Sequence, residues 1–190
     1  MKYFVRTVAA LLVLFFLQAC SATRTNISSR KVVTTETPGT LKKTTSPNKF
    51  VPPRTINTKN IVADSVVDFA ETLIGTRYKY GSAIKEQGFD CSGFITYIFN
   101  HYKIQVPRSS IDFTNAGTPV SLDESKRGDL ILFTGTDTTG WGVGHMGIIT
   151  QNENGTIKFI HSSSGKSIGV IISGMSKYYV TRFVKVIRVF

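Results

Sequence analysis

Hydrophobic positions recur at helical spacing in two stretches of the chain. The first stretch runs from Ile61 to Leu73 and is followed by Gly75, so we expect a helix that Gly75 caps. The second stretch runs from Cys91 to Tyr102 and places four large apolar side chains on one face, namely Phe94, Ile95, Ile98 and Phe99. This spacing predicts two amphipathic helices in the first half of the region 61–190.

Short apolar runs follow these helices. They cover residues 130–133, 146–150, 157–161, 170–172 and 183–189, and clusters of Gly, Asn, Asp and Ser separate them. Such runs are typical of β-strands joined by turns. Helices that precede a series of strands indicate an α+β fold with an antiparallel sheet of about five or six strands, and the region has the length of one domain. No G-x-x-x-x-G-K-[ST] loop and no paired C-x-x-C motif supports nucleotide or zinc binding.

The pattern at residues 1–19 is that of an export signal. Lys2 and Arg6 precede an uncharged apolar run from Val8 to Leu17. A helix of that length spans about 15 Å, which is too short for a bilayer core of ~30 Å. The run ends in L-Q-A-C, which resembles the lipobox of bacterial lipoproteins and implies acylation of Cys20 and cleavage before it. The alternative is an ordinary signal peptide in which Cys20 is incidental.

Residues 21–60 have the composition of a flexible segment. They contain 14 Ser and Thr residues, four prolines and eight Lys or Arg residues, but almost no bulky apolar side chains. Such a stretch cannot bury enough surface to offset the entropy of ordering it. We therefore expect residues 20–60 to form an acylated cysteine and a basic tether, with an end-to-end distance of about 35 Å.

The net charge is +11, which taken alone favours a polyanionic partner such as nucleic acid. Residues 1–60 hold 10 of the 23 basic residues and one of the 12 acidic residues, so they carry +9 and residues 61–190 carry +2. No aromatic residues alternate with the basic residues of the tether. We therefore expect no nucleic-acid partner, although weak attraction to anionic wall polymer or lipid headgroups remains compatible with the tether.

Cys91 is the first candidate for chemistry. If Cys20 carries lipid, Cys91 has no partner within the chain. It lies between Asp90 and Ser92 where a turn becomes a helix, so free N–H groups and the positive end of the helix dipole favour a thiolate there. Asp90 and Ser92 also fit the role of capping residues. A capped helix that begins with a small core residue is therefore the alternative to a nucleophile.

Two of the three histidines lie in predicted strands. His145 lies in V-G-H-M-G-I-I-T between two glycines that allow close approach of another backbone, and His161 ends I-K-F-I-H. Cys91, His145 and His161 would supply the nucleophile, the base and the orienting group of a cysteine hydrolase. Two strand histidines unrelated to Cys91 are the alternative. We expect His101, near the end of the second helix, to lie on the surface.

Six short segments resemble, in order, the motifs of the NlpC/P60 cell-wall peptidases. They are R-Y-K-Y-G at 77–81, D-C-S-G-F at 90–94, V-P-R-S-S at 106–110, R-G-D-L-I-L-F at 127–133, G-H-M-G-I-I at 144–149 and F-I-H-S-S at 159–163. The resemblance covers the whole region 61–190 and is strongest to members that join a lipobox to one catalytic domain. It implies a papain-like α+β fold, with the nucleophile at a helix N-terminus and both histidines on the antiparallel sheet.

The resemblance also implies roles for individual residues. It makes Cys91 the nucleophile, His145 the base and His161 the third polar residue, and it places Tyr78 near the nucleophile to hold the oxyanion or the substrate. The implied reaction is amide hydrolysis through a thioester, without a metal or another cofactor. The implied substrate is peptidoglycan, at a γ-D-glutamyl to diamino-acid bond or a D-alanyl to diamino-acid cross-link.

Five further residues are candidates for substrate contact, namely Asp90, Ser92, Arg108, Ser109 and Trp141. Arg108 and Ser109 follow a proline and fit contacts with substrate carboxylates, although a solvated arginine is the alternative. Trp141 lies in the loop 134–143, which is longer than the family usually has there. It fits stacking on substrate or packing against the domain equally well.

Two other functions remain open from the sequence. An acyltransferase or lipid-directed enzyme of the same fold would use the same cysteine and histidine, and a catalytically silent wall-binding lipoprotein would keep only the cleft. In each case we expect an exported monomer that is anchored to the cell envelope by lipid at Cys20. Ser21 replaces the aspartate that retains some lipoproteins at the inner membrane, which favours the outer membrane, facing the periplasm, in a Gram-negative host.

Overall fold

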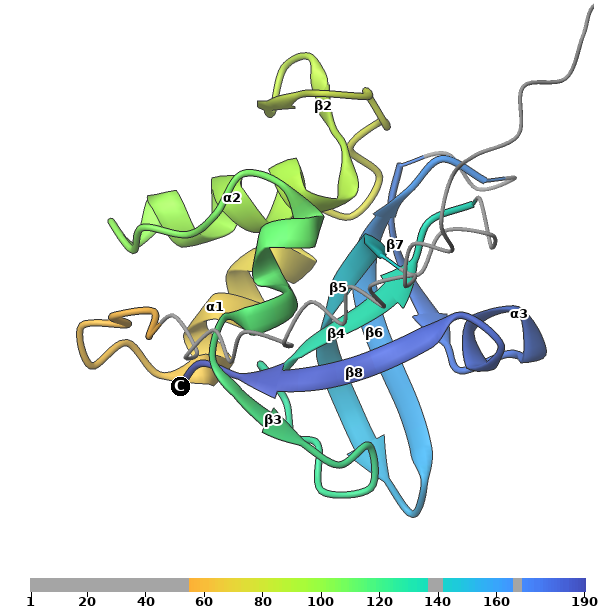
Figure 1. The fold of residues 1–190 in the computed structure, drawn as a ribbon. Helices are drawn as coiled ribbons and strands as arrows, with labels where there is room; N and C mark the ends of the chain where they lie inside the picture. The colour runs from red at the N-terminus through yellow and green to blue at the C-terminus, as the bar shows by residue number, and fades with distance from the viewer. Residues whose placement is uncertain (1–54, 137–141, 166–168) are drawn as a thin grey trace, which may run out of the picture. The chain divides into compact units, whose positions relative to one another are not determined.

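The structure, a computed structural model, describes residues 55–136, 142–165 and 169–190. The predicted signal peptide, Cys20, most of the tether and Trp141 lie outside these residues. The chain begins with helix α1 (Ala63–Glu71), the short strands β1 (Ala83–Ile84) and β2 (Gly88–Phe89), helix α2 (Cys91–His101) and the 3-10 helix η1 (Ser110–Asn115). It continues through β3 (Thr118–Val120), β4 (Leu130–Thr134), β5 (Val143–Glu153), β6 (Thr156–Ser163), β7 (Gly169–Gly174), helix α3 (Lys177–Val180) and β8 (Phe183–Arg188) (Figure 1).

The main sheet has six antiparallel strands in the order β3-β8-β4-β5-β6-β7. Helices α1 and α2 lie on one side of it (Figure 1). The predicted α+β class and antiparallel sheet are confirmed, and the five predicted apolar runs correspond to β4 through β8. Strand β3 and the β1-β2 hairpin escaped prediction because two or three residues carry too little periodicity to indicate a strand.

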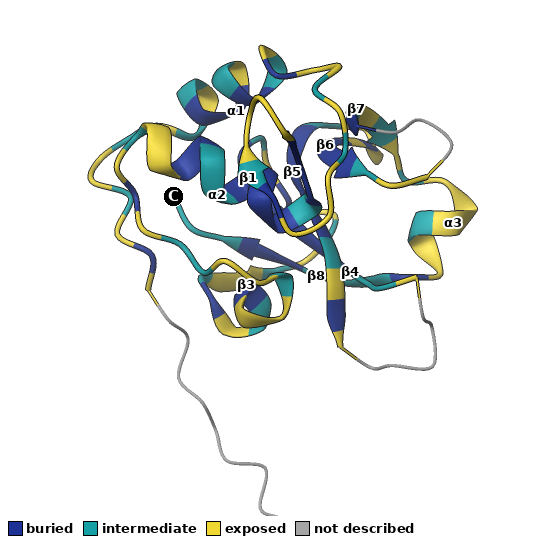
Figure 2. Cartoon of the chain, turned by 90° about the horizontal axis from the view of Figure 1, so that it is seen from above, coloured by how far each residue is buried: buried dark blue, intermediate teal, exposed yellow. Residues whose placement is uncertain are grey.

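Apolar side chains cover both faces of the sheet. Leu130 and Leu132 of β4 pack in the cluster that contains the apolar face of α2, whereas Ile131 and Phe133 pack in a second cluster on the opposite side. A strand buried on both faces reads as a continuous apolar run, which is what residues 130–133 show. Figure 2 shows the buried residues concentrated between the helices and the sheet, with exposed residues on the outer surfaces.

The first helix differs in length from the prediction. Helix α1 ends at Glu71, and the amide groups of Leu73 and Ile74 donate to carbonyls three residues earlier, which tightens the chain into turns. Gly75 does adopt a left-handed conformation (φ 87°), but its N–H donates to the carbonyl of Val170 in β7. The expectation that Gly75 caps the helix is therefore wrong, because this residue connects the turn to the sheet.

The packed domain extends a few residues before 61. Ile56 is 8% exposed and belongs to the core cluster that contains the helices. Ile56 is therefore part of the folded domain, although the composition assigned it to the tether. Among the described residues, no helix has the length and apolar character needed to cross a membrane.

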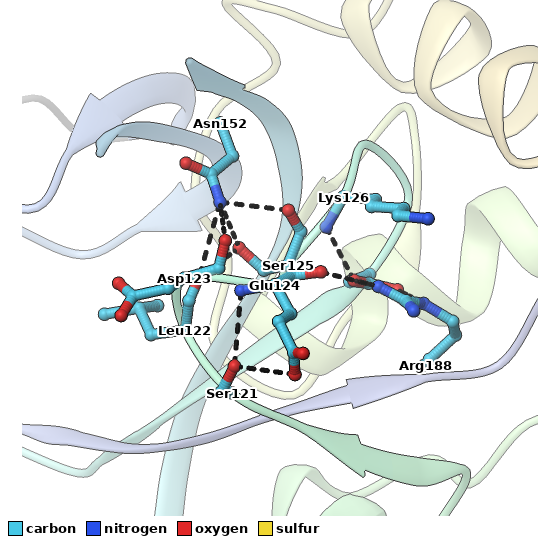
Figure 3. Close-up of polar contacts among 9 residues, drawn as sticks. Ser121, Leu122, Asp123, Glu124, Ser125, Lys126, Asn152 and Arg188 are labelled. Atoms are coloured by element: carbon cyan, nitrogen blue, oxygen red, sulfur yellow. Dashed lines mark hydrogen bonds and ion pairs between the residues drawn. The ribbon is translucent and has the colours of Figure 1, made fainter. Parts of the chain in front are cut away.

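The loop between β3 and β4 is held by two polar side chains from distant strands (Figure 3). The Nδ2 atom of Asn152 donates to the carbonyls of Leu122 (3.3 Å), Asp123 (3.2 Å) and Ser125 (3.0 Å). Arg188 of β8 makes two bonds of 2.9 and 2.7 Å to the carboxylate of Asp129, which is 4% exposed. These contacts satisfy carbonyls that the loop would otherwise leave without donors.

Candidate active site

Cys91 is the first residue of helix α2. Asp90 precedes it as the N-cap, and an oxygen of the Asp90 carboxylate accepts a hydrogen bond of 2.5 Å from the N–H of Gly93. The backbone of Ser82 lies against the same turn, since a Cβ atom on Gly93 would lie 2.0 Å from the Ser82 carbonyl oxygen. Only glycine allows this approach, so the sequence D-C-S-G sets the start of the helix and the position of the thiol.

Arg108 pairs with the Asp90 carboxylate through both of its terminal nitrogens. Nη1 lies 3.1 Å from Oδ1, and Nη2 lies 2.8 Å from Oδ2. Nη1 also donates to the hydroxyl of Ser92 at 3.0 Å. Asp90 (8% exposed) and Ser92 (5% exposed) thus face inward, and the three side chains support the turn that carries Cys91.

The thiol lies against the backbone on both sides of His145. Its Sγ atom is 3.9 Å from the carbonyl oxygen of Gly144, and it also accepts a hydrogen bond from the N–H of Met146. These groups are open to the thiol because β5 pairs with β6 only from Ile148 onward in the described residues. The regular pairing of β5 with β6 therefore stops before His145, and the site lies at this end of the pairing.

His145 and His161 contact each other across the two strands. The Nε2 atom of His145 lies 2.9 Å from Nδ1 of His161, and the two rings are nearly perpendicular. His161 is completely buried, and its own Nε2 lies 2.9 Å from the Ser173 hydroxyl and 3.3 Å from the Tyr179 hydroxyl. Because Nε2 of His145 contacts His161, Nδ1 is the ring nitrogen that remains for an interaction with Cys91.

The two glycines that flank His145 and Met146 allow the strands to approach closely. A Cβ atom on Gly144 would lie 2.5 Å from the Cα of Gly135, and one on Gly147 would lie 2.7 Å from the carbonyl oxygen of Ile160. The prediction of close backbone approach at these positions is confirmed. Side chains there would push β5 away from its neighbours and displace His145 from His161.

Burial keeps the site uncharged in the free protein. It raises the pKa of the Cys91 thiol to about 11, and the neighbouring Asp90 carboxylate adds to the effect. Burial also lowers the pKa of His145 to about 4, helped by the positive charge of Arg182, and it lowers that of His161 to about 3. The helix N-terminus alone favours a thiolate, but desolvation outweighs it, so the Cys91 thiol and the His145 imidazole are both uncharged near pH 7.

The sequence model of the NlpC/P60 family matches residues 75–188 of this chain. The chain belongs to the NlpC/P60 family. It is 31% identical over 183 residues to the murein DD-endopeptidase MepS/murein LD-carboxypeptidase of Escherichia coli strain K12, which covers 94% of this chain and 88% of that protein. It is 34% identical over 114 residues to the probable endopeptidase NlpC of the same strain, covering 59% of this chain and 68% of that protein.

Solved structures agree with this assignment. An NlpC/P60 family protein from Bacillus cereus ATCC 10987 is 26% identical and superimposes with a TM-score of 0.59. The match covers 67% of this chain and 40% of that one. The predicted papain-like NlpC/P60 fold is therefore confirmed, and the chain is a hydrolase of the peptidase type.

Three other residues considered in the sequence analysis, Tyr78, Ser109 and His101, differ in how close they lie to Cys91 and in how exposed they are. Tyr78 lies close to the thiol, since burial and the nearby Cys91 raise its pKa, and its hydroxyl bonds to Ser164. Ser109 is exposed and precedes η1. His101 is exposed, as expected, and stacks on Phe69 with ring centroids 3.9 Å apart.

Three residues of the NlpC/P60 site carried no signal in the sequence. Ser173 and Tyr179 contact His161, and Arg182 shifts the pKa of His145. They lie 12 to 21 positions after His161 and belong to no motif, so only the pairing of β7 with β6 and the position of α3 bring them to the histidines. Within the described ranges, no group of three or more His, Cys, Asp or Glu side chains is placed to hold a metal ion.

Proposed function

We propose that this chain is a peptidoglycan hydrolase, a cysteine endopeptidase that cleaves an amide bond in murein stem peptides or their cross-links. The observation that carries the proposal is the contact of the Cys91 thiol with the backbone flanking His145, whose ring lies 2.9 Å from His161. The names of the relatives support the substrate, because the similar Escherichia coli protein is a murein endopeptidase. Cys91 is the proposed nucleophile, His145 the base and His161 the orienting residue.

The tautomers follow from the direction of proton transfer. To accept the thiol proton at Nδ1, His145 carries its own hydrogen on Nε2 and donates it to Nδ1 of His161. His161 then carries its hydrogen on Nε2 and donates to the Ser173 hydroxyl at 2.9 Å. This order of donors fixes the orientation of the His145 ring, as the third residue of a catalytic triad does.

The reaction proceeds in two halves. His145 takes the thiol proton as the sulfur of Cys91 attacks the carbonyl carbon, and the oxyanion is stabilised by the N–H groups at the start of α2 and by the Tyr78 hydroxyl. The protonated His145 gives this proton to the leaving amine as the C–N bond breaks, which leaves a thioester on Cys91. Water then gives a proton to His145 as its oxygen attacks the thioester carbon, and the C–S bond breaks to release the carboxylic acid while His145 returns the proton to the sulfur.

Two other functions fit the same fold and are separated by their products. An acyltransferase or lipid-directed enzyme would release or transfer fatty acid instead of creating new amino groups in the wall. A silent wall-binding protein would bind peptidoglycan equally well with Cys91 or with alanine in its place. The peptidase is favoured because the Cys91 thiol lies against the backbone that flanks His145, and the His145 ring in turn contacts the buried imidazole of His161.

The decisive experiment is digestion of purified peptidoglycan by residues 55–190, followed by mass spectrometry of the fragments. Cys91→Ala is expected to abolish fragment release, and the fragment masses identify the bond that the parent cleaves. Cys91→Ser is the matched control, because it keeps the size and hydrogen bonding of the side chain while the hydroxyl is a weaker nucleophile. Equal fragments from the parent and Cys91→Ala would exclude the cysteine mechanism.

We also propose that the chain is exported and anchored to the cell envelope by lipid on Cys20, at the outer membrane facing the periplasm if the host is Gram-negative. The order of features in residues 1–20 supports this, and the basic tether 21–60 would let the domain reach the wall. Mass spectrometry of the mature N-terminus tests it. The expected species begins at an acylated Cys20, and Cys20→Ser is expected to remain unprocessed.

A further inference from the structure

A cavity of about 530 Å³ lies beside His145. Its walls include the ends of β4 and β6 together with α3 and the residues after it, and Arg182, Tyr178 and Tyr179 line it next to Ser163 and Ser164. Neither Cys91 nor Tyr78 lines this cavity. His145 is therefore the member of the proposed triad that lines the cavity.

Arg182 is a buried cation in the wall of this cavity. Its side chain belongs to a residue that is only 6% exposed. Nη2 donates to the Thr134 carbonyl at 2.7 Å, Nη1 donates to the Tyr178 hydroxyl, and Nε has no hydrogen-bond partner among the described residues. Burial lowers the pKa of Arg182, which shows that its charge is poorly compensated.

Three other arginines differ from Arg182 because their charges are balanced by carboxylates. In the described part of the chain, Arg108, Arg127 and Arg188 each pair with at least one carboxylate, and each remains more exposed than Arg182. No described carboxylate forms an ion pair with Arg182. A buried guanidinium with a free N–H costs free energy unless an anion completes its contacts.

The position of His145 indicates which part of a substrate reaches the cavity. His145 protonates the leaving amine in the proposed reaction, so that amine comes within hydrogen-bond distance of the imidazole. The residue that carries the amine then continues past His145, away from the acyl group on Cys91. Because His145 also lines the cavity, this part of the substrate comes close to it, and Arg182 is the arginine in its described wall.

We propose that the Arg182 cavity binds a carboxylate on the leaving half of the substrate. The inference rests on the peptidoglycan hydrolase function proposed above, and both bonds implied by the sequence resemblance place a diamino acid on the leaving side. The Arg182 guanidinium supplies the positive charge beside the cavity, and the Tyr178 hydroxyl accepts a hydrogen bond from its Nη1. Arg108, which the sequence offered for substrate carboxylates, already has Asp90 as its partner.

The test compares substrates before it compares variants. Stem-peptide fragments from purified peptidoglycan are prepared with free carboxyl groups or with carboxyl groups converted to amides, and kcat/KM is measured for both. For the unmodified protein we expect amidation to lower kcat/KM by about 10- to 100-fold, the effect of losing one charge-assisted hydrogen bond. In Arg182→Met, kcat/KM for the free acid is expected to fall to the level of the amide, and amidation is expected to change it less than about threefold.

Two variants keep the result interpretable if Arg182→Met folds poorly. Arg182→Lys keeps the charge and is expected to retain part of the preference for the free acid, whereas Tyr178→Phe removes one contact of the guanidinium and is expected to keep most of it. In Asp137→Asn the preference should also remain, because the inference assigns the substrate carboxylate, and not Asp137, as the anionic partner of Arg182. A preference that appears only in Asp137→Asn would show that Arg182 pairs with Asp137 and would overturn the inference.

The outcomes separate this inference from the proposed function. If the unmodified protein cleaves neither form, the peptidoglycan hydrolase proposal fails. If it cleaves both forms at equal rates, or if Arg182→Met slows both by the same factor, the hydrolase proposal stands and the carboxylate site is refuted.

Discussion

Replacement of Asp90 by asparagine separates the two effects of this residue on the nucleophile. Asparagine caps a helix about as well as aspartate, so the hydrogen bond to the N–H of Gly93 is expected to remain. The negative charge disappears, and the guanidinium of Arg108 loses its anionic partner. Since Asp90 disfavours the thiolate, the variant is expected to lower the pKa of Cys91 and leave the start of α2 in place.

The size of the change follows from the causes of the shift. Burial is the first cause of the rise in the Cys91 pKa to about 11, and the Asp90 charge is the second. Removing the charge should therefore lower the pKa by about one unit, which corresponds to about 1.4 kcal/mol, and leave the effect of burial unchanged. The cost in unfolding free energy is about 1 kcal/mol, because the Arg108 side chain is 44% exposed and its ion pair is partly screened by water.

The rate of Cys91 alkylation by iodoacetamide as a function of pH measures this pKa directly. Asp129→Asn is the matched control, because Asp129 also pairs with an arginine through both oxygens and also accepts a backbone N–H, that of Lys126. Asp129 is not among the charges that shift the Cys91 pKa, so its variant is expected to lose stability without moving the alkylation curve. An unchanged or raised pKa in Asp90→Asn would refute the electrostatic argument.

Three further predictions follow from the site and its support. His145→Ala is expected to abolish turnover and His161→Ala to leave a trace, because orientation contributes less than the base; equal kcat values for the two variants would contradict this order. Lowering the pH from about 6.5 towards 4 should reduce the unfolding free energy by about 1.4 kcal/mol per pH unit for each of His145 and His161, because these histidines bind protons in the unfolded chain but not in the folded one. Urea titrations at several pH values measure this dependence. The unfolding free energy should change less steeply with pH in His161→Asn. Asn152→Leu should lower stability by about 2 kcal/mol in the same titrations and leave kcat unchanged, since its contacts hold only the loop 121–129.

The candidate nucleophile and its helix could be read from local sequence. Asp90, Cys91 and Gly93 act within one turn, so a cap, a nucleophile and a small residue at these spacings specify the geometry without the rest of the fold. The strand positions of His145 and His161 were equally visible, because each ends or begins an apolar run. The spacing of hydrophobic residues predicted the α+β class in the same way, because helical and strand periods are visible within short segments.

The charge states were not predictable in this way. The helix N-terminus predicts a thiolate at Cys91, yet burial in the assembled domain raises its pKa to about 11. The partners of Arg108 also depend on the fold, since the loop that carries it returns to Asp90 after 18 positions. Solvent exposure decides the charge state of Cys91, and contacts between distant segments decide the partners of Arg108. A short window of sequence contains neither kind of information.

The sequence by itself thus determined the family, the class of fold and the identity of the three residues proposed to react, because each depends on patterns within a few residues. Only the tertiary structure decided that the regular pairing of β5 with β6 stops at Ile148, that Ser173 and Tyr179 contact His161, and that Arg182 lines a cavity beside His145. These features arise from strand register and from the packing of α3, which join segments far apart in the chain. The physical reason is that burial and electrostatic potential belong to the assembled domain and not to any single segment.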